Sequence, residues 1–275
     1  MIDENIEKSL KRFLKRKISV NESVVVKFLI TGLIGATLTA CGGGGGGGSS
    51  SGGVTPPKPE NSINVNEVFG KTEITDKKEI ILVGEKTDST ISNKPAISAK
   101  NSTVTNEANL NLSGKKVTAI SGVNSNIINK ANITLNGEGA TALKGETDTV
   151  LKNKALEISI QNNGNITLNG KNQTGILVIS KNGKISGINK GTINVNGENG
   201  SGMKADGSGA TIINNGNIKV SQNFIAETPD LDPRTQMSKG MYILNGGTGT
   251  NNKNIEVQGS SIGMFADGKN SIATK

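Results

Sequence analysis

A short phrase of alternating apolar and polar residues recurs along the chain beyond residue 100. Its first aliphatic position is filled in successive copies by Leu110, Ile133, Ile166, Ile193, Ile218 and Ile255. Strict alternation is typical of a strand that buries one face. These positions are 23, 33, 27, 25 and 37 residues apart. A repeat of this size indicates a solenoid, in which stacked units together bury apolar rows that no single unit can bury alone.

Turn residues follow most of these strands. Four of the six copies continue into a Ser-Gly or Asn-Gly pair, at 113–114, 136–137, 169–170 and 196–197. Asn-Gly reverses the chain easily because both residues tolerate positive φ. No segment after residue 60 carries a helical apolar stripe of ten or more residues. The pattern therefore predicts an all-β fold without helices, a parallel β-solenoid with coils of about 23–27 residues over 61–275.

Composition agrees with a thin aliphatic interior and excludes several chemistries. The chain has 37 glycines, 2% aromatic residues, no histidine and no tryptophan. Without histidine there is no Ser-His-Asp or Cys-His catalysis and no His-ligated zinc. The single cysteine excludes an intrachain disulfide and a cysteine-cluster metal site. We expect no catalytic residue, no cofactor and no bound metal.

Asparagine-rich turns that include Asp206 and Asp267 raise calcium binding as an alternative. The calcium-binding nonapeptide needs G-G-x-G-x-D at strict spacing, and the repeats do not keep this spacing. We favour turn geometry together with stacked asparagine ladders, in which the side-chain amides satisfy one another.

The basic residues do not indicate nucleic-acid binding. The net charge is +8, of which residues 1–40 carry +3 and residues 41–275 carry +5. In the second segment Arg234 is the only arginine. Nucleic-acid sites favour arginine forks and stacking aromatic rings, so we expect no nucleic-acid partner.

The N-terminal segment, residues 1–40, has the pattern of an export signal. A basic stretch over 8–17 precedes an apolar run of 13 residues over 28–40, which is too short to span a bilayer. A basic region followed by a short apolar region is typical of a secretory signal. The alternative, a buried core helix beside a basic amphipathic helix, is disfavoured by the glycine tract that follows.

The end of this segment resembles a bacterial lipobox. Leu38, Thr39 and Ala40 directly precede Cys41, the only cysteine of the chain. The resemblance implies cleavage before Cys41 and acylation of that residue, and several acyl chains would hold the protein on a membrane. The alternative is an incidental small apolar cysteine. Residues 41–60, rich in Gly, Ser and Pro, are expected to form a flexible tether.

Three parts of the chain depart from the repeat. Residues 224–236 lengthen one coil and bring together Asp230, Asp232 and Arg234, which we expect on a loop without an aromatic sugar platform. Residues 61–100 contain strand-like segments without the clear phrase and are expected to be atypical capping coils. The last residues correspond to the start of another coil, so we expect the chain to be part of a longer protein.

The basic start over 10–20, the apolar segment over 28–32 and the Asn-x-Gly-x-Ile repeats resemble type V autotransporters of Gram-negative anaerobes. The start is similar to their autotransporter-associated N-terminal region. This resemblance implies a right-handed β-helix passenger shown on the cell surface, and a C-terminal β-barrel in the outer membrane. The sequence up to Lys275 shows no run of barrel-like strands, so we expect the barrel to be encoded beyond it or the chain to be a fragment.

Three functions are compatible with these observations. The first is a surface-exposed passenger with a structural or adhesive role toward host or bacterial surfaces. The second is a stand-alone β-solenoid surface lipoprotein. The third is a β-helical polysaccharide lyase or hydrolase, for which Asp230, Asp232 and Arg234 are the candidate residues. We expect the first, with the outer membrane and surface ligands as partners and with no enzymatic activity.

Overall fold

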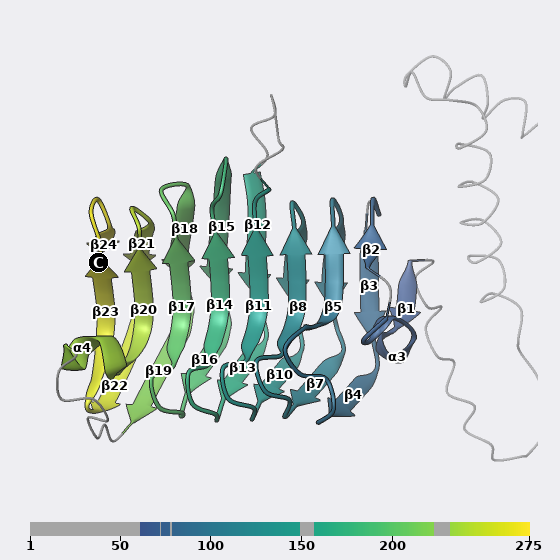
Figure 1. The fold of residues 1–275 in the computed structure, drawn as a ribbon, viewed down its shortest axis with the longest axis horizontal. Helices are drawn as coiled ribbons and strands as arrows, with labels where there is room; N and C mark the ends of the chain where they lie inside the picture. Colours follow the sequence, from purple (N-terminus) through teal and green to yellow (C-terminus); the bar gives the residue numbers. More distant parts are fainter. Residues whose placement is uncertain (1–60, 72, 78, 149–156, 223–231) are drawn as a thin grey trace, which may run out of the picture. The chain divides into compact units, whose positions relative to one another are not determined.

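The computed structural model describes residues 61–71, 73–77, 79–148, 157–222 and 232–275. The expected signal segment, Cys41 and the tether lie outside these residues. The described part is a stack of coils from β1 to β24, with all strand pairs parallel (Figure 1). This architecture confirms the predicted all-β parallel solenoid.

Successive coils add their strands to three parallel sheets. The nine-stranded sheet contains, in order, β1 (Ser62–Asn64), β3 (Ile80–Val83), β6 (Thr103–Asn106), β9 (Asn126–Asn129), β12 (Glu157–Asn162), β15 (Lys184–Asn189), β18 (Ala210–Asn214), β21 (Thr248–Asn251) and β24 (Ile272–Thr274). The seven-stranded sheet contains β4 (Glu85–Asp88), β7 (Asn109–Leu112), β10 (Asn132–Leu135), β13 (Asn165–Leu168), β16 (Thr192–Val195), β19 (Asn217–Gln222) and β22 (Asn254–Gly259). The eight-stranded sheet contains β2 (Ile74–Thr75), β5 (Pro95–Lys100), β8 (Thr118–Val123), β11 (Thr141–Glu146), β14 (Thr174–Ile179), β17 (Ser201–Asp206), β20 (Ser238–Leu244) and β23 (Ser261–Asp267).

The recurring phrase forms the seven-stranded sheet, in register. Its aliphatic positions pair from β7 to β22 in the order Leu110, Ile133, Ile166, Ile193, Ile218 and Ile255. The first five of these side chains are at most 2% exposed. One earlier strand also belongs to this row, because Lys86 of β4 pairs with Leu110. Its ammonium group lies 5.0 Å from the centre of the Phe69 ring. Because a lysine stands where the other copies have an aliphatic residue, this copy of the phrase is not recognisable in the sequence.

The interior is narrow and aliphatic, as the composition predicts. Among the described residues, Phe69 is the only aromatic side chain in the buried core. Glycines make room where coils meet closely. A Cβ on Gly145 would lie 2.4 Å from the side chain of Ile160, closer than real carbon atoms approach. Small inward residues thus face long ones, and this pairing fills the interior without large rings.

The expectation of a helix-free body is wrong at two places. The helices α3 (Val65–Val68) and α4 (Pro233–Gln236) each have four residues. Asn64 caps α3 by accepting the backbone N–H of Asn66, and Asp232 caps α4 by accepting that of Arg234. Such a single turn is made by its cap rather than by an apolar stripe, so a search for long helical periodicity misses it. Within the described residues, no helix has the length and apolar character needed to cross a bilayer.

Candidate functional site

A line of asparagine side chains runs through the interior, at the ends of strands in the nine-stranded sheet. This buried asparagine ladder consists of Asn106, Asn129, Asn162, Asn189, Asn214 and Asn251. Each Nδ2 donates to the Oδ1 of the next asparagine over 2.8–3.0 Å. Every member except Asn214 also donates from Nδ2 to the backbone carbonyl two residues further on, and the Nδ2 of Asn214 donates instead to the carbonyl of Asn254 at 3.2 Å. The predicted stacking of asparagine amides is therefore confirmed, and it satisfies polar groups that burial would otherwise leave unpaired.

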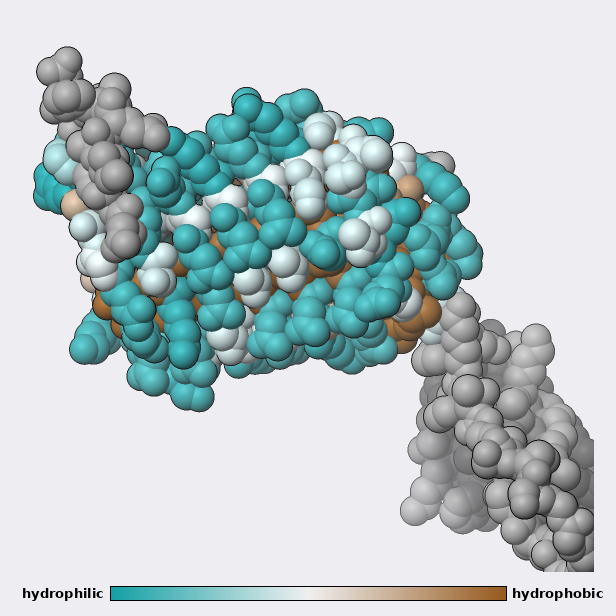
Figure 2. All heavy atoms as spheres, turned by 90° about the horizontal axis from the view of Figure 1, so that it is seen from below, coloured by the Kyte–Doolittle hydropathy of each residue, from teal (hydrophilic) through white to brown (hydrophobic). Residues whose placement is uncertain are grey.

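A second, exposed asparagine ladder lies outside, beginning within β7 of the seven-stranded sheet and continuing at the turns after β10, β13 and β16. It consists of Asn111, Asn136, Asn169 and Asn196, whose amides are joined over 2.9–3.0 Å. Viewed from below, the side on which Figure 1 draws the seven-stranded sheet, the surface is mostly hydrophilic with narrow apolar strips (Figure 2). In-register stacking therefore produces a long polar face in which neighbouring coils present the same groups.

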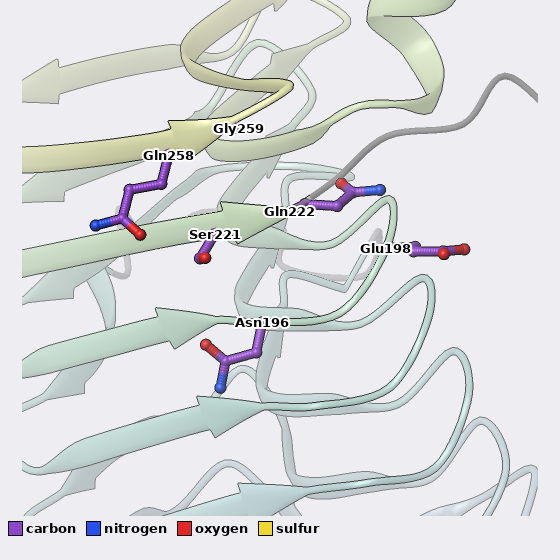
Figure 3. A pocket seen from close by; sticks show the side chains of 6 residues that line it. All are labelled: Asn196, Glu198, Ser221, Gln222, Gln258 and Gly259. Carbon is purple, nitrogen blue, oxygen red and sulfur yellow. The ribbon is translucent and has the colours of Figure 1, made fainter.

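A shallow polar hollow lies where three successive coils turn, at the ends of β16, β19 and β22 (Figure 3). It is lined by Asn196, Glu198, Ser221, Gln222, Gln258 and Gly259. Glu198 is the one charged residue of the lining, and it pairs with Lys171 at 3.7 Å. The Oε1 atom of Gln222 accepts the backbone N–H of Ser238 at 2.9 Å. The hollow can form hydrogen bonds with a polar ligand, but its lining contains no pair of titratable groups for acid–base chemistry.

Aromatic and cationic side chains gather on the outer face of the eight-stranded sheet, near its last strands. We call Lys204, Arg234, Lys239, Tyr242 and Phe265 the aromatic–cation cluster. Lys204, Tyr242 and Phe265 occupy one register position on β17, β20 and β23. The two rings stack, with centroids 5.6 Å apart. The ammonium group of Lys204 lies 5.3 Å from the centre of the Tyr242 ring, within reach of a cation–π interaction.

Lys239 is the most buried charged residue of this cluster. Its side chain is only 1% exposed, and its Nζ donates to the carbonyls of Thr235, at 3.1 Å, and Met237. The same Nζ lies 5.0 Å from the centre of the Tyr242 ring. These contacts hold α4 against the sheet, where Figure 1 shows it beside β23. Burial, with a smaller effect of Lys204, lowers the pKa of Lys239 to about 8.

The candidate residues on the predicted loop fall partly within the described structure. Asp230 and residues 224–231 lie outside it. Asp232 accepts from Nε and Nη2 of Arg234 over 2.7–3.0 Å, and this pairing holds the pKa of the carboxyl below its usual value. The Arg234 guanidinium lies 5.8 Å from the centre of the Phe265 ring. The structure therefore brings Asp232 and Arg234 together, and adds an aromatic neighbour from another coil.

Sequence reasoning missed the ring pair of this cluster. The signal was present, because Lys204, Tyr242 and Phe265 each follow a Gly-Met dipeptide, which recurs at 202–203, 240–241 and 263–264. Stacking covers one face of each ring, and cations lie over both rings. The pair is therefore not an open platform of the kind that a sugar ring requires. Among the described residues, no three His, Cys, Asp or Glu side chains are grouped closely enough to hold a metal ion.

We expect Lys239 to make the stability of the domain depend on pH. The folded-state pKa of about 8 lies below the ordinary value of 10.5, so the unfolded chain binds more protons between these pH values. The free energy of unfolding of the natural chain, minus that of Lys239→Met, should therefore rise by about 2–3 kcal/mol from pH 8 to pH 10.5. Urea unfolding of both proteins across this range measures it. A difference that stays flat with pH contradicts the buried amine.

Comparison with known proteins identifies a family. A family model described as the BigA third pectate lyase-like domain matches residues 44–254, which include all strands from β1 to β21. No curated protein and no solved structure matches the chain. The matched region covers most of the chain and has the repeated β-helical architecture described above. The chain therefore belongs to the family of BigA third pectate lyase-like domains.

Proposed function

We propose that this domain is the surface-exposed passenger of an autotransporter, with a structural or adhesive role. The observation that carries the proposal is the repetition of polar groups from coil to coil, seen in the exposed asparagine ladder. Ion pairs between coils extend this surface, such as Lys130 with Glu107 at 3.0 Å and Lys115 with Glu138 at 2.8 Å. A regular array of weak contacts suits multivalent binding, in which many modest interactions act together.

A polysaccharide-active enzyme is the second candidate, because the family name contains the words pectate lyase-like. The protonation and pairing of Asp232 and Arg234 disfavour such an enzyme. The general acid of a glycoside hydrolase needs a carboxyl pKa raised toward neutrality, whereas Arg234 lowers that of Asp232. A lyase needs a base that can take up a proton, whereas the hydrogen bond to Asp232 raises the pKa of Arg234 and keeps its guanidinium protonated. The two side chains also use their hydrogen-bonding groups on each other. We propose that they hold α4 in place and take no part in turnover.

Adherence and turnover assays separate these two functions. We expect purified protein to bind bacterial or host cells, and to lose only part of this binding when residues 224–236 are deleted, because the contacts are spread over the stack. Loop length changes are thermodynamically cheap, so the solenoid should stay folded. In parallel, Arg234→Ala and Asp232→Asn are assayed against a panel of acidic polysaccharides. Turnover that one of these substitutions abolishes would overturn the adhesive function.

We further propose that the protein is anchored at the outer membrane of a Gram-negative bacterium through Cys41, with host or bacterial surface molecules as its partners. Cys41→Ser should abolish incorporation of a labelled fatty acid, because only the thiol forms the thioether with diacylglycerol. Inhibition of the lipoprotein signal peptidase should make the unprocessed precursor accumulate. Natural protein that takes up no lipid label contradicts the anchor. A stop codon directly after Lys275 would favour the stand-alone surface lipoprotein over the autotransporter passenger.

A further inference from the structure

Asn-Gly pairs are unusually frequent in this chain. There are eight, at 136–137, 163–164, 169–170, 182–183, 196–197, 199–200, 215–216 and 245–246. Such a pair can lose ammonia by itself, because glycine has no Cβ to hinder the approach of its backbone nitrogen to the preceding side chain. The reaction needs two free groups, the asparagine amide and the glycine N–H. The eight pairs differ in whether these two groups are hydrogen-bonded in the structure.

Seven of the pairs are held by hydrogen bonds. In the exposed asparagine ladder, the amides of Asn136, Asn169 and Asn196 are joined to one another. The N–H groups of Gly164, Gly170, Gly197, Gly200, Gly216 and Gly246 all donate hydrogen bonds. The amides of Asn199, Asn215 and Asn245 are bonded as well. Each of these seven pairs therefore has to open at least one native hydrogen bond before it can react.

The pair Asn182-Gly183 differs from the others. It forms the exposed turn between β14 and β15. Within the part of the chain that the structure describes, neither the Asn182 amide nor the Gly183 N–H forms a hydrogen bond. The backbone N–H of Asn182 donates to Thr147 Oγ1 at 3.1 Å. This bond does not involve the side-chain amide of Asn182. Gly183 has φ +89°, and no atom lies within 4 Å of where its Cβ would be.

We propose that Asn182 is a site of self-catalysed modification in the folded protein. The backbone nitrogen of Gly183 attacks Cγ of Asn182, so that an N–Cγ bond forms and the Cγ–Nδ2 bond breaks. Ammonia leaves with the proton that the Gly183 nitrogen gives up, and a five-membered succinimide remains. Water then opens one of its two carbonyls to give aspartate or isoaspartate. No electron is transferred and no other reactant is needed.

The product changes the charge of this turn. A carboxylate replaces a neutral amide between two exposed lysines, Lys181 and Lys184. Lys181 pairs with Glu146 in the unmodified protein, so the new carboxylate competes with Glu146 for the same ammonium group. When isoaspartate forms, the main chain of the turn also gains one methylene. The fraction of molecules that carry this modification on their surface should therefore increase with the time since folding.

Peptide mapping by mass spectrometry tests the proposal on the full-length purified chain. The protein is incubated at neutral and mildly alkaline pH, and the converted fraction is measured at all eight pairs. We expect conversion at Asn182 to exceed that at each of the other pairs by at least about tenfold, since those pairs must first break native hydrogen bonds. Asn169 is the matched internal control. Equal conversion at Asn182 and Asn169 in the folded protein overturns the proposal.

Three further experiments test whether the fold, rather than the local sequence alone, sets the rate at Asn182. In urea, where the hydrogen bonds are gone, the eight pairs should react at rates within about threefold of one another. A preference for Asn182 that persists in urea would overturn the role of the fold. Conversely, Gln173→Ala removes the acceptor of the Gly170 N–H and should speed conversion at Asn169. Asn182→Gln should remove the signal from the 182–183 turn, because glutamine would have to close a larger ring.

Discussion

Replacing Ile193 with aspartate is expected to unfold the domain or force one of its coils open. Ile193 is 0% exposed and stacks in register between Ile166 and Ile218. A carboxylate at this position would be buried without a partner, which costs several kcal/mol unless it is protonated. The apolar contacts of the isoleucine are lost as well. Because folded domains are stable by only about 5–15 kcal/mol, we expect a large fall in the urea concentration at which half of the protein is unfolded. Circular dichroism monitors this unfolding.

The neighbouring residue supplies the control. Asn194 is half-buried and lies in register with Thr167 and Lys219 on the outer face of the same sheet. Asn194→Asp should change the free energy of unfolding by no more than about 0.5 kcal/mol. Both substitutions introduce the same carboxylate on the same strand. Equal tolerance of the two would contradict the assignment of inner and outer faces.

The buried asparagine ladder gives the second large effect. Asn162 is 0% exposed, donates to Asn189 Oδ1 and to the Gly164 carbonyl, and accepts from Asn129. Asn162→Ala would break all three hydrogen bonds and leave the buried Oδ1 of Asn189 without its donor, whereas the Gly164 carbonyl keeps the backbone N–H of Thr192. Each such loss costs about 1–3 kcal/mol, so we expect destabilisation of roughly 3–5 kcal/mol. Urea unfolding at neutral pH measures this change in the free energy of unfolding.

A second asparagine of the same coil tests whether burial matters. Asn165 is exposed and donates to Asn132 Oδ1 at 3.0 Å. Water can replace this bond when the side chain is removed, so Asn165→Ala should have an effect within about 0.5 kcal/mol. A loss of stability as large as that of Asn162→Ala would mean that the hydrogen bond between asparagines of neighbouring coils, rather than burial, determines the contribution.

The repeated phrase was sufficient to predict the class of the fold and the register of the seven-stranded sheet. This succeeded because an aliphatic residue such as Ile133 must stack on its equivalents in neighbouring coils, and each one-residue slip would expose it. The prediction failed where a strand lacks the aliphatic residue of the phrase, and where a short helix is formed by its capping residue. Lys86 takes the aliphatic position in β4 by placing its charge over Phe69. The helices α3 and α4 depend on single capping side chains, which leave no periodic signal.

The candidate site was predicted less completely than the fold. The proximity of Asp232 to Arg234 follows from their separation by one residue, and the structure pairs them. The burial of Lys239 does not follow from its neighbours in sequence, because lysine is seldom inside. It depends on the segment from Thr235 to Met237, whose carbonyls accept hydrogen bonds from the ammonium group. These acceptors lie only four and two residues before Lys239, but the equivalent coils have no such segment, so the repeat does not reveal the contact.

The nearest-neighbour arrangement of the coils has a mechanical consequence. In the repeats without a long insertion, equivalent strands such as β7 and β10, or β13 and β16, are offset by 23 and 27 residues. Since strand pairing joins each coil only to the next, a pull on one end loads one layer of hydrogen bonds at a time. The domain should then yield in steps, each releasing roughly 80–90 Å of chain at about 3.4 Å per residue. A cell held by such a protein would be on a tether that lengthens under load before it breaks.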